Sequence, residues 1–269
     1  MVAPAYFAAE TEKNTPPTAF ITGASSGIGL ELARLFAQHG SNLVLLARNR
    51  AQLHEIAAQM SGVSVHVIAK DLAHPRAPRE VFDELQEKNI IVDVLVNNAG
   101  FGTHGKFGET PLGTQLEMIQ LNVMALTELT HLLLPSMLAR RSGKVMNVAS
   151  TAAFQPGPLM AVYYATKAYV LSFSEAIANE LRGSGVSVTC LCPGATETNF
   201  AKRADMENSR LFRMGAMDAK LVAQAGLDGL VKGETLVIPG AKNKFLAQSV
   251  RLAPRKLVTA ISRSIQETR

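Results

Sequence analysis

The amino-acid sequence predicts an α/β fold in which a doubly wound parallel sheet of about seven strands lies between two layers of helices. Three observations support this class. Short runs of Val, Ile and Leu are continuous, which is typical of strands buried on both faces. These runs alternate along the chain with segments whose apolar residues recur at helical spacing. Glycines and other turn residues separate the two kinds of segment.

The first half of the chain establishes this alternation. Residues 18–22 form a short apolar run that ends in a glycine-rich turn, which predicts a strand followed by a loop. From 28 to 39 apolar residues recur at helical spacing, and Gly40 follows where a glycine commonly ends a helix. The remaining elements predicted here are strands at 42–46, 63–69 and 91–96 and helices at 50–60 and 76–88.

The second half repeats the pattern with longer helices. A helical region at 112–139 is expected to be interrupted near Pro135, because proline lacks the N–H that a helix interior uses. The following predicted elements are a strand at 144–148, a helix at 161–182, a strand at 186–191, an irregular segment at 193–217, one more helix and a strand near 235–238. No repeat or linker interrupts this order, so we expect a single catalytic domain.

The two ends of the chain lie outside the alternating core. Residues 1–17 mix prolines with acidic residues and are expected to form a flexible arm. The catalytic domain is expected at 18–240, with a lid segment at 199–217. The extension 241–269 has seven basic residues and one acid, Glu267. We expect it to belong to the same domain with a solvated basic face. Three further roles stay open: covering the pocket, joining a subunit interface, or a peripheral contact with an anionic membrane.

Composition and charge exclude several classes of function. The 269 residues have a formal net charge of +5 without the basic runs of nucleic-acid-binding segments. No stretch approaches the ~18 uninterrupted apolar residues of a membrane-spanning helix, and the first residues do not resemble a signal peptide. Cys190 and Cys192 are too close on one strand to bridge and lack further metal ligands. We therefore expect a cytoplasmic protein without a metal or a nucleic-acid partner.

The turn after the first predicted strand has the pattern of a phosphate-binding loop. It reads Thr22-Gly23-Ala-Ser-Ser-Gly27-Ile28-Gly29 and opens a helix. Gly23 permits a sharp turn, Gly27 lets the backbone approach a pyrophosphate, and Gly29 lets the helix pack on the sheet. The positive end of the helix then faces the phosphates. The expected cofactor contacts in this turn are Gly23, Ser25, Ser26, Gly27, Ile28 and Gly29.

The end of the second predicted strand indicates which cofactor binds. An NAD site usually has an acidic residue here that binds the ribose 2′-hydroxyl, whereas this chain has Ala47 and Arg48. A guanidinium binds a 2′-phosphate through two oriented hydrogen bonds, so the sequence favours NADP(H) over NAD(H). Arg50 is an alternative for the same task. After the third strand, Asp71 and Leu72 are expected to contact the adenine.

Six motifs in order resemble those of the short-chain dehydrogenase/reductase superfamily over about residues 18–240. Besides the glycine turn they are Asn97-Asn98-Ala99-Gly100, Asn122, Ser150, Tyr163-Tyr164-Ala-Thr-Lys167 and Pro193-Gly194-Ala-Thr196-Glu-Thr198. The segment around Tyr163 is similar to that of the NADPH-dependent ketoreductase branch, of 3-oxoacyl, steroid-type and broad-specificity enzymes. The resemblance implies a Rossmann-type fold, a nicotinamide cofactor and redox chemistry between carbonyl and alcohol.

The spacing of Tyr163 and Lys167 suits proton transfer. Four residues apart on a helix, they project from one face. The ammonium and a nicotinium charge would lower the phenol pKa from its usual ~10, so that Tyr163 can exchange a proton with a substrate oxygen. The resemblance implies that Ser150 holds that oxygen, that Asn122 holds a water on the proton path, and that Lys167 also binds the nicotinamide ribose.

The resemblance implies further cofactor contacts in two other turns. One is the turn at 98–100, where Asn98 would also brace neighbouring strands. The other is the turn at 193–198, which would bind the carboxamide and phosphates of the nicotinamide half. These expected contacts are Asn98, Ala99, Gly100, Pro193, Gly194, Thr196 and Thr198, beside Tyr163 and Lys167. Tyr164 has an alanine rather than a lysine four residues later, so it is expected in the core or on the surface.

Two segments are expected to close the substrate pocket. One is 101–107, where His104 either touches the substrate or is an exposed loop residue. The other is the lid segment, which suits a mobile cover over an apolar substrate, although it could also pack on its own domain. Its apolar side chains are Phe200, Leu211, Phe212, Met214 and Met217.

The sequence therefore predicts an NADP-dependent oxidoreductase that reduces an apolar ketone or runs the reverse oxidation. Hydride would come from nicotinamide C4 and a proton from Tyr163. One alternative is an NAD-linked alcohol dehydrogenase that works in the oxidising direction. Another is a nucleotide-sensing protein without turnover, although such proteins usually lose the tyrosine or the lysine. The resemblance implies a homodimer or homotetramer, with the helices at 112–139 and 161–182 packed across a two-fold axis.

Overall fold

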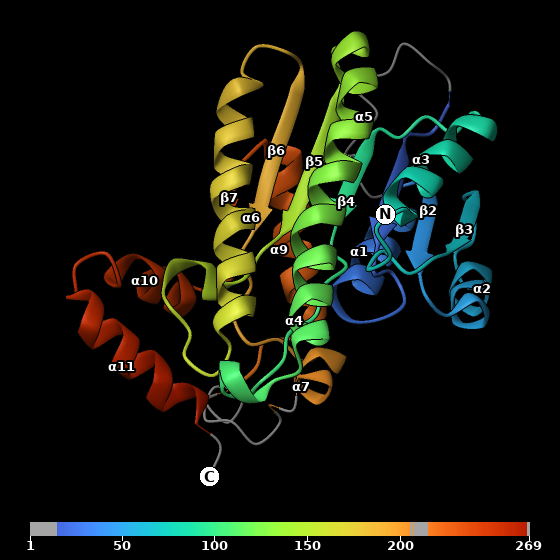
Figure 1. The fold of residues 1–269 in the computed structure, drawn as a ribbon. Helices are drawn as coiled ribbons and strands as arrows, with labels where there is room; N and C mark the ends of the chain where they lie inside the picture. The colour runs from blue at the N-terminus through green and yellow to red at the C-terminus, as the bar shows by residue number, and fades with distance from the viewer. Residues whose placement is uncertain (1–14, 205, 207–214, 268–269) are drawn as a thin grey trace.

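The computed structural model describes residues 15–204, 206 and 215–267, which form a seven-stranded parallel sheet in the order β3-β2-β1-β4-β5-β6-β7 (Figure 1). The strands are β1 (Thr18–Thr22), β2 (Asn42–Ala47), β3 (Val65–Ala69), β4 (Val94–Asn97), β5 (Gly143–Val148), β6 (Val186–Leu191) and β7 (Leu236–Val237). The winding reverses between β1 and β4, so the carboxyl ends of these two strands define the expected ligand crevice. The predicted Rossmann-type, doubly wound fold is confirmed.

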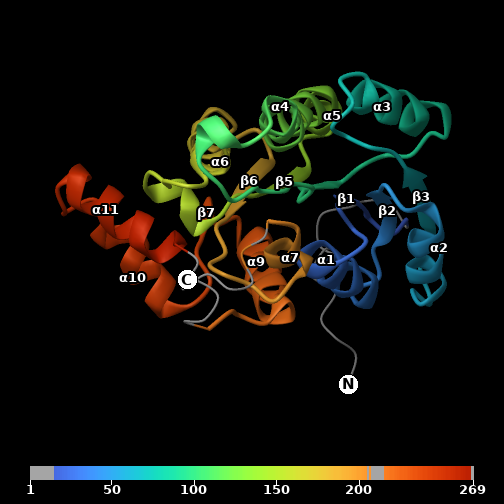
Figure 2. The ribbon, with the colours of Figure 1, turned by 60° about the horizontal axis from the view of Figure 1, so that its bottom comes forward.

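Helices cover both faces of the sheet, so that the sheet is the middle of three layers (Figure 2). One face has α1 (Gly27–Gln38), α2 (Arg50–Ala58) and α9 (Ala219–Lys232), and the other has α3 (Ala77–Glu87), α4 (Leu112–Ile119), α5 (Leu126–Arg140) and α6 (Ala161–Glu180). Neighbouring strand residues feed two separate cores: Ile21 packs with Leu32 on one side, and Phe20 packs with Leu129 on the other. This two-sided burial explains why the strand sequences are continuously apolar.

The predicted interruption near Pro135 was wrong. Helix α5 continues through Pro135, and the irregular stretch is instead a π-helical turn, η2 (Gln120–Ala125), between α4 and α5. Burial of Leu133 and Met137 on either side of the proline offsets the single helical hydrogen bond that it removes. This wide turn contains Asn122, and π-helical turns occur frequently at functional sites. The whole run Leu112–Arg140 has the length and apolar composition of a membrane span, but its α5 half packs on the sheet.

The lid segment and the extension both contain helices that the sequence analysis does not predict. The lid segment begins with a short helix, α7 (Asn199–Arg203), whereas its residues Leu211, Phe212 and Met214 lie outside the described residues. The extension folds into two helices, α10 (Ala241–Ser249) and α11 (Arg255–Gln266), which lie beside the β7 edge of the sheet (Figures 1 and 2). Residues 1–14 of the expected arm also lie outside the described part.

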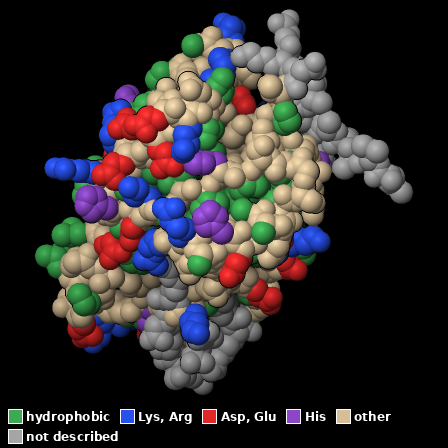
Figure 3. All heavy atoms as spheres, turned by 90° about the vertical axis from the view of Figure 1, so that its right-hand side faces the viewer, with side chains coloured by type: hydrophobic (Ala, Val, Ile, Leu, Met, Phe, Trp, Pro, Cys, Tyr) green, Lys and Arg blue, Asp and Glu red, His purple; other side chains and the backbone are tan. Residues whose placement is uncertain are grey.

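The opposite edge of the sheet is covered by charge. On the face that includes α2, α3 and β3, acidic and basic side chains are mixed (Figure 3). His66 and Lys70, from β3 and just beyond it, pair with Glu84 and Glu80 of α3 at 2.8 and 2.9 Å. Charged side chains protect an edge strand against pairing with another chain.

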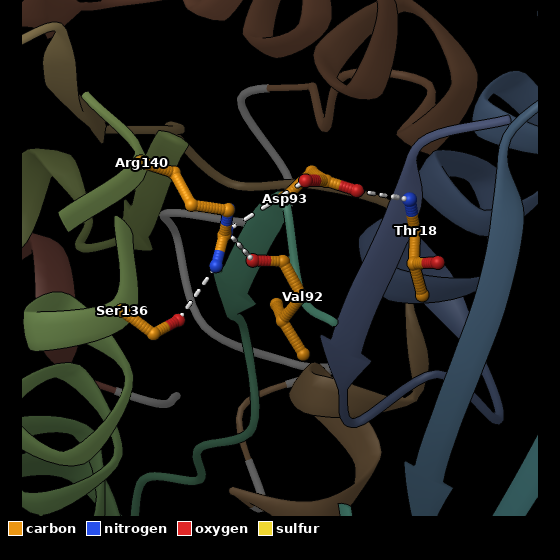
Figure 4. A network of polar contacts seen from close by, with 5 residues as sticks. All are labelled: Thr18, Val92, Asp93, Ser136 and Arg140. Carbon is orange, nitrogen blue, oxygen red and sulfur yellow. Dashed lines mark hydrogen bonds and ion pairs between the residues drawn. The ribbon is translucent and has the colours of Figure 1, made fainter. Parts of the chain in front are cut away.

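An ionic network fixes the amino ends of the central strands, away from the ligand crevice (Figure 4). The Thr18 backbone N–H donates to Asp93 Oδ2 at 2.9 Å, and Arg140 at the end of α5 lies 3.7 Å from the other carboxylate oxygen. Arg140 also donates to the Val92 carbonyl at 3.0 Å and to the Ser136 hydroxyl at 2.8 Å. The network therefore ties β1, β4 and α5 together.

A buried chain of polar side chains joins the middle of the sheet to its helices. Asn97 Nδ2 donates to Thr130 of α5 at 3.0 Å and to Asn147 Oδ1 of β5 at 2.9 Å. Asn147 Nδ2 in turn donates to Ser174 of α6 at 2.9 Å. Because all four side chains are buried, each lost partner leaves a polar group in a dry environment.

Replacing Asn147 by leucine should destabilise the protein by about 2–4 kcal/mol, since it removes an acceptor for Asn97 and a donor to Ser174. Urea denaturation followed by circular dichroism measures this change. The control is Thr189→Val on β6, whose buried hydroxyl has no hydrogen-bond partner among the described residues. It should leave stability within about 0.5 kcal/mol, and equal losses in the two variants would contradict this account of the network.

Candidate active site

A cleft of about 970 Å³ opens at the carboxyl ends of the strands. Most of the residues expected at the site line it: Gly23, Ser25, Ser26, Gly27, Ile28, Arg48, Asp71, Leu72, Asn98, Ala99, Gly100, Tyr163, Lys167, Pro193, Gly194, Thr196 and Thr198. Gly29, Asn122 and Ser150 are not among the lining residues. Gly29 and Asn122 support residues that are, and Ser150 lies between the lining residues Ala149 and Thr151 with its hydroxyl towards Tyr163. The cleft thus runs from the end of β2, past the glycine turn, to helix α6.

The glycine turn is shaped by backbone conformations and contacts that a side chain would prevent. Gly23 and Gly27 have φ of +67° and +56°, the left-handed region that favours glycine. A Cβ on Gly29 would lie 2.4 Å from the Gly23 carbonyl oxygen and from Asn98 Nδ2. The Ser26 side chain does not cap α1. The first-turn N–H groups of this helix are therefore left for an anionic ligand.

Hydrogen bonds hold this turn against the end of β4. The Thr22 hydroxyl accepts from the backbone N–H groups of Asn98 and Ala99, both at 3.0 Å. Asn98 Nδ2 donates to the carbonyls of Thr22 at 2.9 Å and Gly23 at 3.2 Å. From α2, Gln52 donates to the Ser25 carbonyl at 3.0 Å. Asn98 thus braces the two strands that border the crevice.

Arg48 lies at the end of the cleft beyond β2. Its guanidinium is 3.8 Å from the Asp71 carboxylate, and both side chains are about half exposed. Such an exposed pair contributes at most about 1 kcal/mol, so Arg48 can exchange Asp71 for a phosphate. Asp71 also accepts from the Ala73 N–H at 3.0 Å, and Leu72 is buried beneath it.

Tyr163 and Lys167 lie on one face of α6, and both are buried. Lys167 Nζ lies 5.8 Å from the centre of the Tyr163 ring and donates to the Val148 carbonyl at the end of β5, at 2.8 Å. Ser150, two residues further, begins the 3₁₀ helix η3 (Thr151–Phe154), and its hydroxyl accepts from the Ala152 N–H at 3.1 Å. Ser150 is therefore a turn-capping residue that also faces the Tyr163 phenol.

Burial shifts the pKa values of this pair in opposite directions. It raises the pKa of Tyr163 above its ordinary value, and the Ser150 hydroxyl acts against this rise. It lowers the pKa of Lys167 to about 8. The expected lowering of the phenol pKa is therefore not found here, because desolvation is the largest influence on Tyr163 and outweighs the hydrogen bond with Ser150. An added positive charge in the cleft would favour the phenolate further.

Asn122 supports the site from behind the cleft wall. Its Nδ2 donates to the Phe101 carbonyl at 2.9 Å and to the Thr166 hydroxyl at 3.1 Å, and its Oδ1 accepts from the Phe101 N–H at 3.1 Å. A Cβ on Gly100 would lie 3.0 Å from Asn122 and 3.6 Å from Lys167 Nζ. The Asn122 side chain thus fixes the turn after β4 directly beside the lysine.

The turn after β6 forms the opposite wall. The Pro193 carbonyl accepts from the Thr151 N–H at 2.8 Å, and Thr196 donates to the Gly194 carbonyl at 3.0 Å. Thr198 caps α7 by accepting from the Phe200 N–H at 3.2 Å. The Phe200 ring lies 5.1 Å from the Tyr163 ring, between centroids. The described start of the lid segment therefore packs directly on the candidate proton donor.

The residues present fit a dinucleotide cofactor. Uncapped N–H groups at a helix start suit a pyrophosphate, an exposed guanidinium lies at one end of the cleft, and Lys167 can donate at the other. The close backbone approach at Gly29 and Gly100 leaves no space for larger side chains. Along this line, the chain can hold the two phosphates, both riboses and a ring next to Tyr163.

The extension covers part of the pocket, one of the roles that the sequence left open for it, through residues that no sequence pattern marked. Asn243 of α10 packs so closely on Gly194 that a Cβ there would lie 2.6 Å from its amide nitrogen, and the same nitrogen donates to the Pro239 carbonyl at 2.9 Å. His104 is not among the residues that line the cleft, and its Nε2 donates to the Gln266 carbonyl of α11 at 2.8 Å. Tyr164, set aside as a core or surface residue, is buried and lines the cleft. No local pattern marks contacts between residues so far apart in the chain.

Comparisons with known proteins agree with this geometry. The family model of the short chain dehydrogenases matches residues 17–209. Among curated proteins, the ketoacyl reductase HetN of Nostoc sp. is 31% identical over 227 residues, which cover 83% of this chain and 78% of the relative.

Two solved structures are similar over most of the chain. A short-chain dehydrogenase from Sphingobium yanoikuyae in complex with NADPH has a TM-score of 0.79 and 34% identity, and the match covers 88% of this chain and 94% of that one. The bulky-bulky ketone specific alcohol dehydrogenase from Comamonas testosteroni has a TM-score of 0.75 and 31% identity, with 89% and 93% covered.

The lowered pKa of Lys167 predicts how stability depends on pH. The folded state releases this proton near pH 8 and the unfolded state near 10.5, so between these values the unfolded state binds more protons and stability rises with pH. From pH 7.5 to 9.5 the wild type should gain about 2 kcal/mol relative to Lys167→Met. Urea titrations of both proteins at several pH values measure the difference, and parallel pH profiles would contradict the shift.

Proposed function

The chain belongs to the short-chain dehydrogenase/reductase family, and we propose that it is an NADPH-dependent reductase of apolar ketones. Its family makes it an oxidoreductase that interconverts carbonyl and alcohol groups of small molecules with a nicotinamide cofactor. The observation that carries the proposal is the buried pair Tyr163 and Lys167, which faces the same cleft as the glycine turn.

The residues of the site suit ketone reduction as follows. A bound NADPH supplies the hydride for the carbonyl carbon. The Ser150 hydroxyl donates a hydrogen bond to the carbonyl oxygen and stabilises its developing negative charge. Tyr163 gives its proton to that oxygen, which completes the alcohol, and the raised pKa of this phenol keeps the proton in place until charge develops. Lys167 then favours the resulting phenolate. The reverse oxidation uses the same groups.

Two features support NADPH as the cofactor. Arg48 stands where an acidic residue would bind a free ribose 2′-hydroxyl, and its pairing with Asp71 is weak enough to exchange for a 2′-phosphate. Lys70 adds a second basic side chain to the same end of the cleft. The relative from Sphingobium yanoikuyae is a complex with NADPH.

The apolar character of the substrate is inferred from the wall of the cleft near Tyr163. This wall is formed by Met160 and Phe200 beside the tyrosine, and by the inner side of the extension. Its apolar extension residues are Leu246, Val250, Ala253, Val258, Ile261 and Ile265. A ketone with a hydrophobic body gains free energy by covering these side chains.

Tyr163→Phe should lower kcat for ketone reduction by about 100- to 10,000-fold, because it removes the proton donor while it keeps the ring. NADPH binding, followed by fluorescence titration, should be unchanged. Tyr169→Phe is the control, since it makes the same change on the exposed side of α6. Full activity in Tyr163→Phe would overturn the mechanism, and normal NADPH binding without any turnover in the wild type would favour a nucleotide-sensing protein.

Arg48→Asp should shift the ratio of kcat/KM for NADPH over NADH by at least about 10-fold towards NADH, because a carboxylate repels the 2′-phosphate and accepts from a ribose hydroxyl. The change is read from steady-state kinetics with both cofactors. The matched control Arg50→Asp, outside the cleft wall, should keep the wild-type ratio. If Arg50→Asp switches preference instead, the specificity belongs to that arginine.

We also propose a homodimer built on the run from α4 through η2 to α5, where Leu112 and Leu116 of α4 and Met124 of η2 are exposed. Apolar side chains grouped on one face are typical of subunit interfaces. Leu116→Lys should convert the dimer to a monomer in sedimentation velocity, and a monomeric wild type would contradict the proposal.

A further inference from the structure

Helix α11 forms a wall of the substrate half of the cleft, and its two sides differ. Val258, Ser262 and Gln266, four residues apart, are buried against the domain. Ile261 and Ile265 beside them line the cleft. The outer side of the helix has the basic residues Arg255, Lys256 and Arg263, all exposed. The inner side can therefore contact a substrate, while the basic residues of α11 are exposed on its outer side.

Gln266 is fixed at the end of this wall from two directions. Its Nε2 donates to the hydroxyl of Tyr164 on α6, and its backbone carbonyl accepts from His104 Nε2 in the loop after β4 at 2.8 Å. The side chain is 1% exposed. Segments separated by more than a hundred residues thus hold one glutamine in place.

Tyr164, the partner of Gln266, is itself immobilised. A Cβ on Gly157 would lie 2.2 Å from its ring, so the ring fills the space that the glycine leaves. Its centroid is 6.1 Å from that of Tyr163, and the two rings meet edge to face. Ser262 and Gln266 both face its hydroxyl. Because Tyr163 and Tyr164 are consecutive residues of α6, this helix fixes the position of Gln266 relative to the candidate proton donor.

One polar atom in this arrangement lacks a partner. Gln266 Oε1 is buried and accepts no hydrogen bond from the described residues, although the residue lines the cleft. The other amide-containing and hydroxyl-containing residues with such atoms, Ser41, Asn97, Ser187 and Thr189, lie in the fold away from the cleft. A buried acceptor without a donor is unfavourable, and a ligand that brings a donor to it gains that free energy on binding.

We propose that Gln266 is a specificity-determining residue whose side-chain oxygen accepts a hydrogen bond from a hydroxyl or N–H group on the substrate, away from the reacting carbonyl. The inference rests on the proposed ketone reduction. It narrows the substrate class to a ketone with an apolar body, covered by Val258, Ile261 and Ile265, and one hydrogen-bond donor at its far end. A site built to pair a substrate donor discriminates strongly against the analogue that lacks it.

The test compares an apolar ketone with its monohydroxylated isomers, in which the hydroxyl lies at different distances from the carbonyl. The wild type should show a higher kcat/KM for at least one isomer than for the parent ketone. This increase should come from a lower KM. Gln266→Met, similar in shape but without the acceptor, should lower this preference about 10-fold, the effect of one hydrogen bond. The preference is the ratio of the two kcat/KM values within each variant, so a general loss of activity cancels from it.

Two further variants make the result specific. Gln266→Glu keeps an acceptor oxygen and should keep most of the preference. Lys256→Met introduces the same side chain on the exposed side of α11 and should keep all of it. The inference is overturned if no isomer is preferred, if Gln266→Met retains the wild-type preference, or if Gln266→Glu loses it equally. Reduction of the parent ketone in each of these cases would leave the proposed function intact, whereas no turnover of any ketone would reject both.

Discussion

The hydrogen bonds between the ends of β1 and β4 are the constraint on which the site depends. The Thr22 hydroxyl holds two consecutive backbone N–H groups of the turn after β4, and Asn98 returns two bonds to the turn after β1. The helices that follow these paired strands lie on opposite faces because the winding of the sheet reverses here, and each turn alone would be free to move. Their mutual bonding fixes the glycine turn beside Gly100, and so fixes the cofactor cleft relative to α6.

Burial then gives the pair on α6 its chemical character. Tyr163 keeps its proton more firmly than an exposed phenol, and Lys167 keeps its proton less firmly than an exposed ammonium. Both shifts have one cause, the loss of water around charge, so both respond to any charged ligand that enters the cleft. The buried hydrogen-bonded chain through Asn97 and Asn147 supports this arrangement, because it ties α5 to β4 and α6 to β5.

The extension makes the cleft asymmetric. On the cofactor side the wall is formed by turns that follow the strands, whereas on the substrate side α10 and α11 close it with residues from the last part of the chain. Asn243 packs on the turn at Gly194, and Gln266 joins α11 to Tyr164 and His104. The cofactor half and the substrate half of the cleft thus meet at α6. Substitutions on the apolar inner side of α11 would not disturb the glycine turn.

The sequence by itself determined the fold class, the order of strands and helices, and the cleft residues of the glycine turn and of the Tyr163–Lys167 pair. Continuous apolar strands, helical periodicity and a glycine turn are local patterns, and parallel topology brings strand ends together without further information. Tertiary structure alone decided the rest. Packing carried α5 through Pro135 and moved the irregular turn to Asn122, burial reversed the expected pKa shift of Tyr163, and contacts across the whole chain brought Gln266 to Tyr164. Desolvation and long-range packing depend on neighbours in space, which no local pattern in the chain specifies.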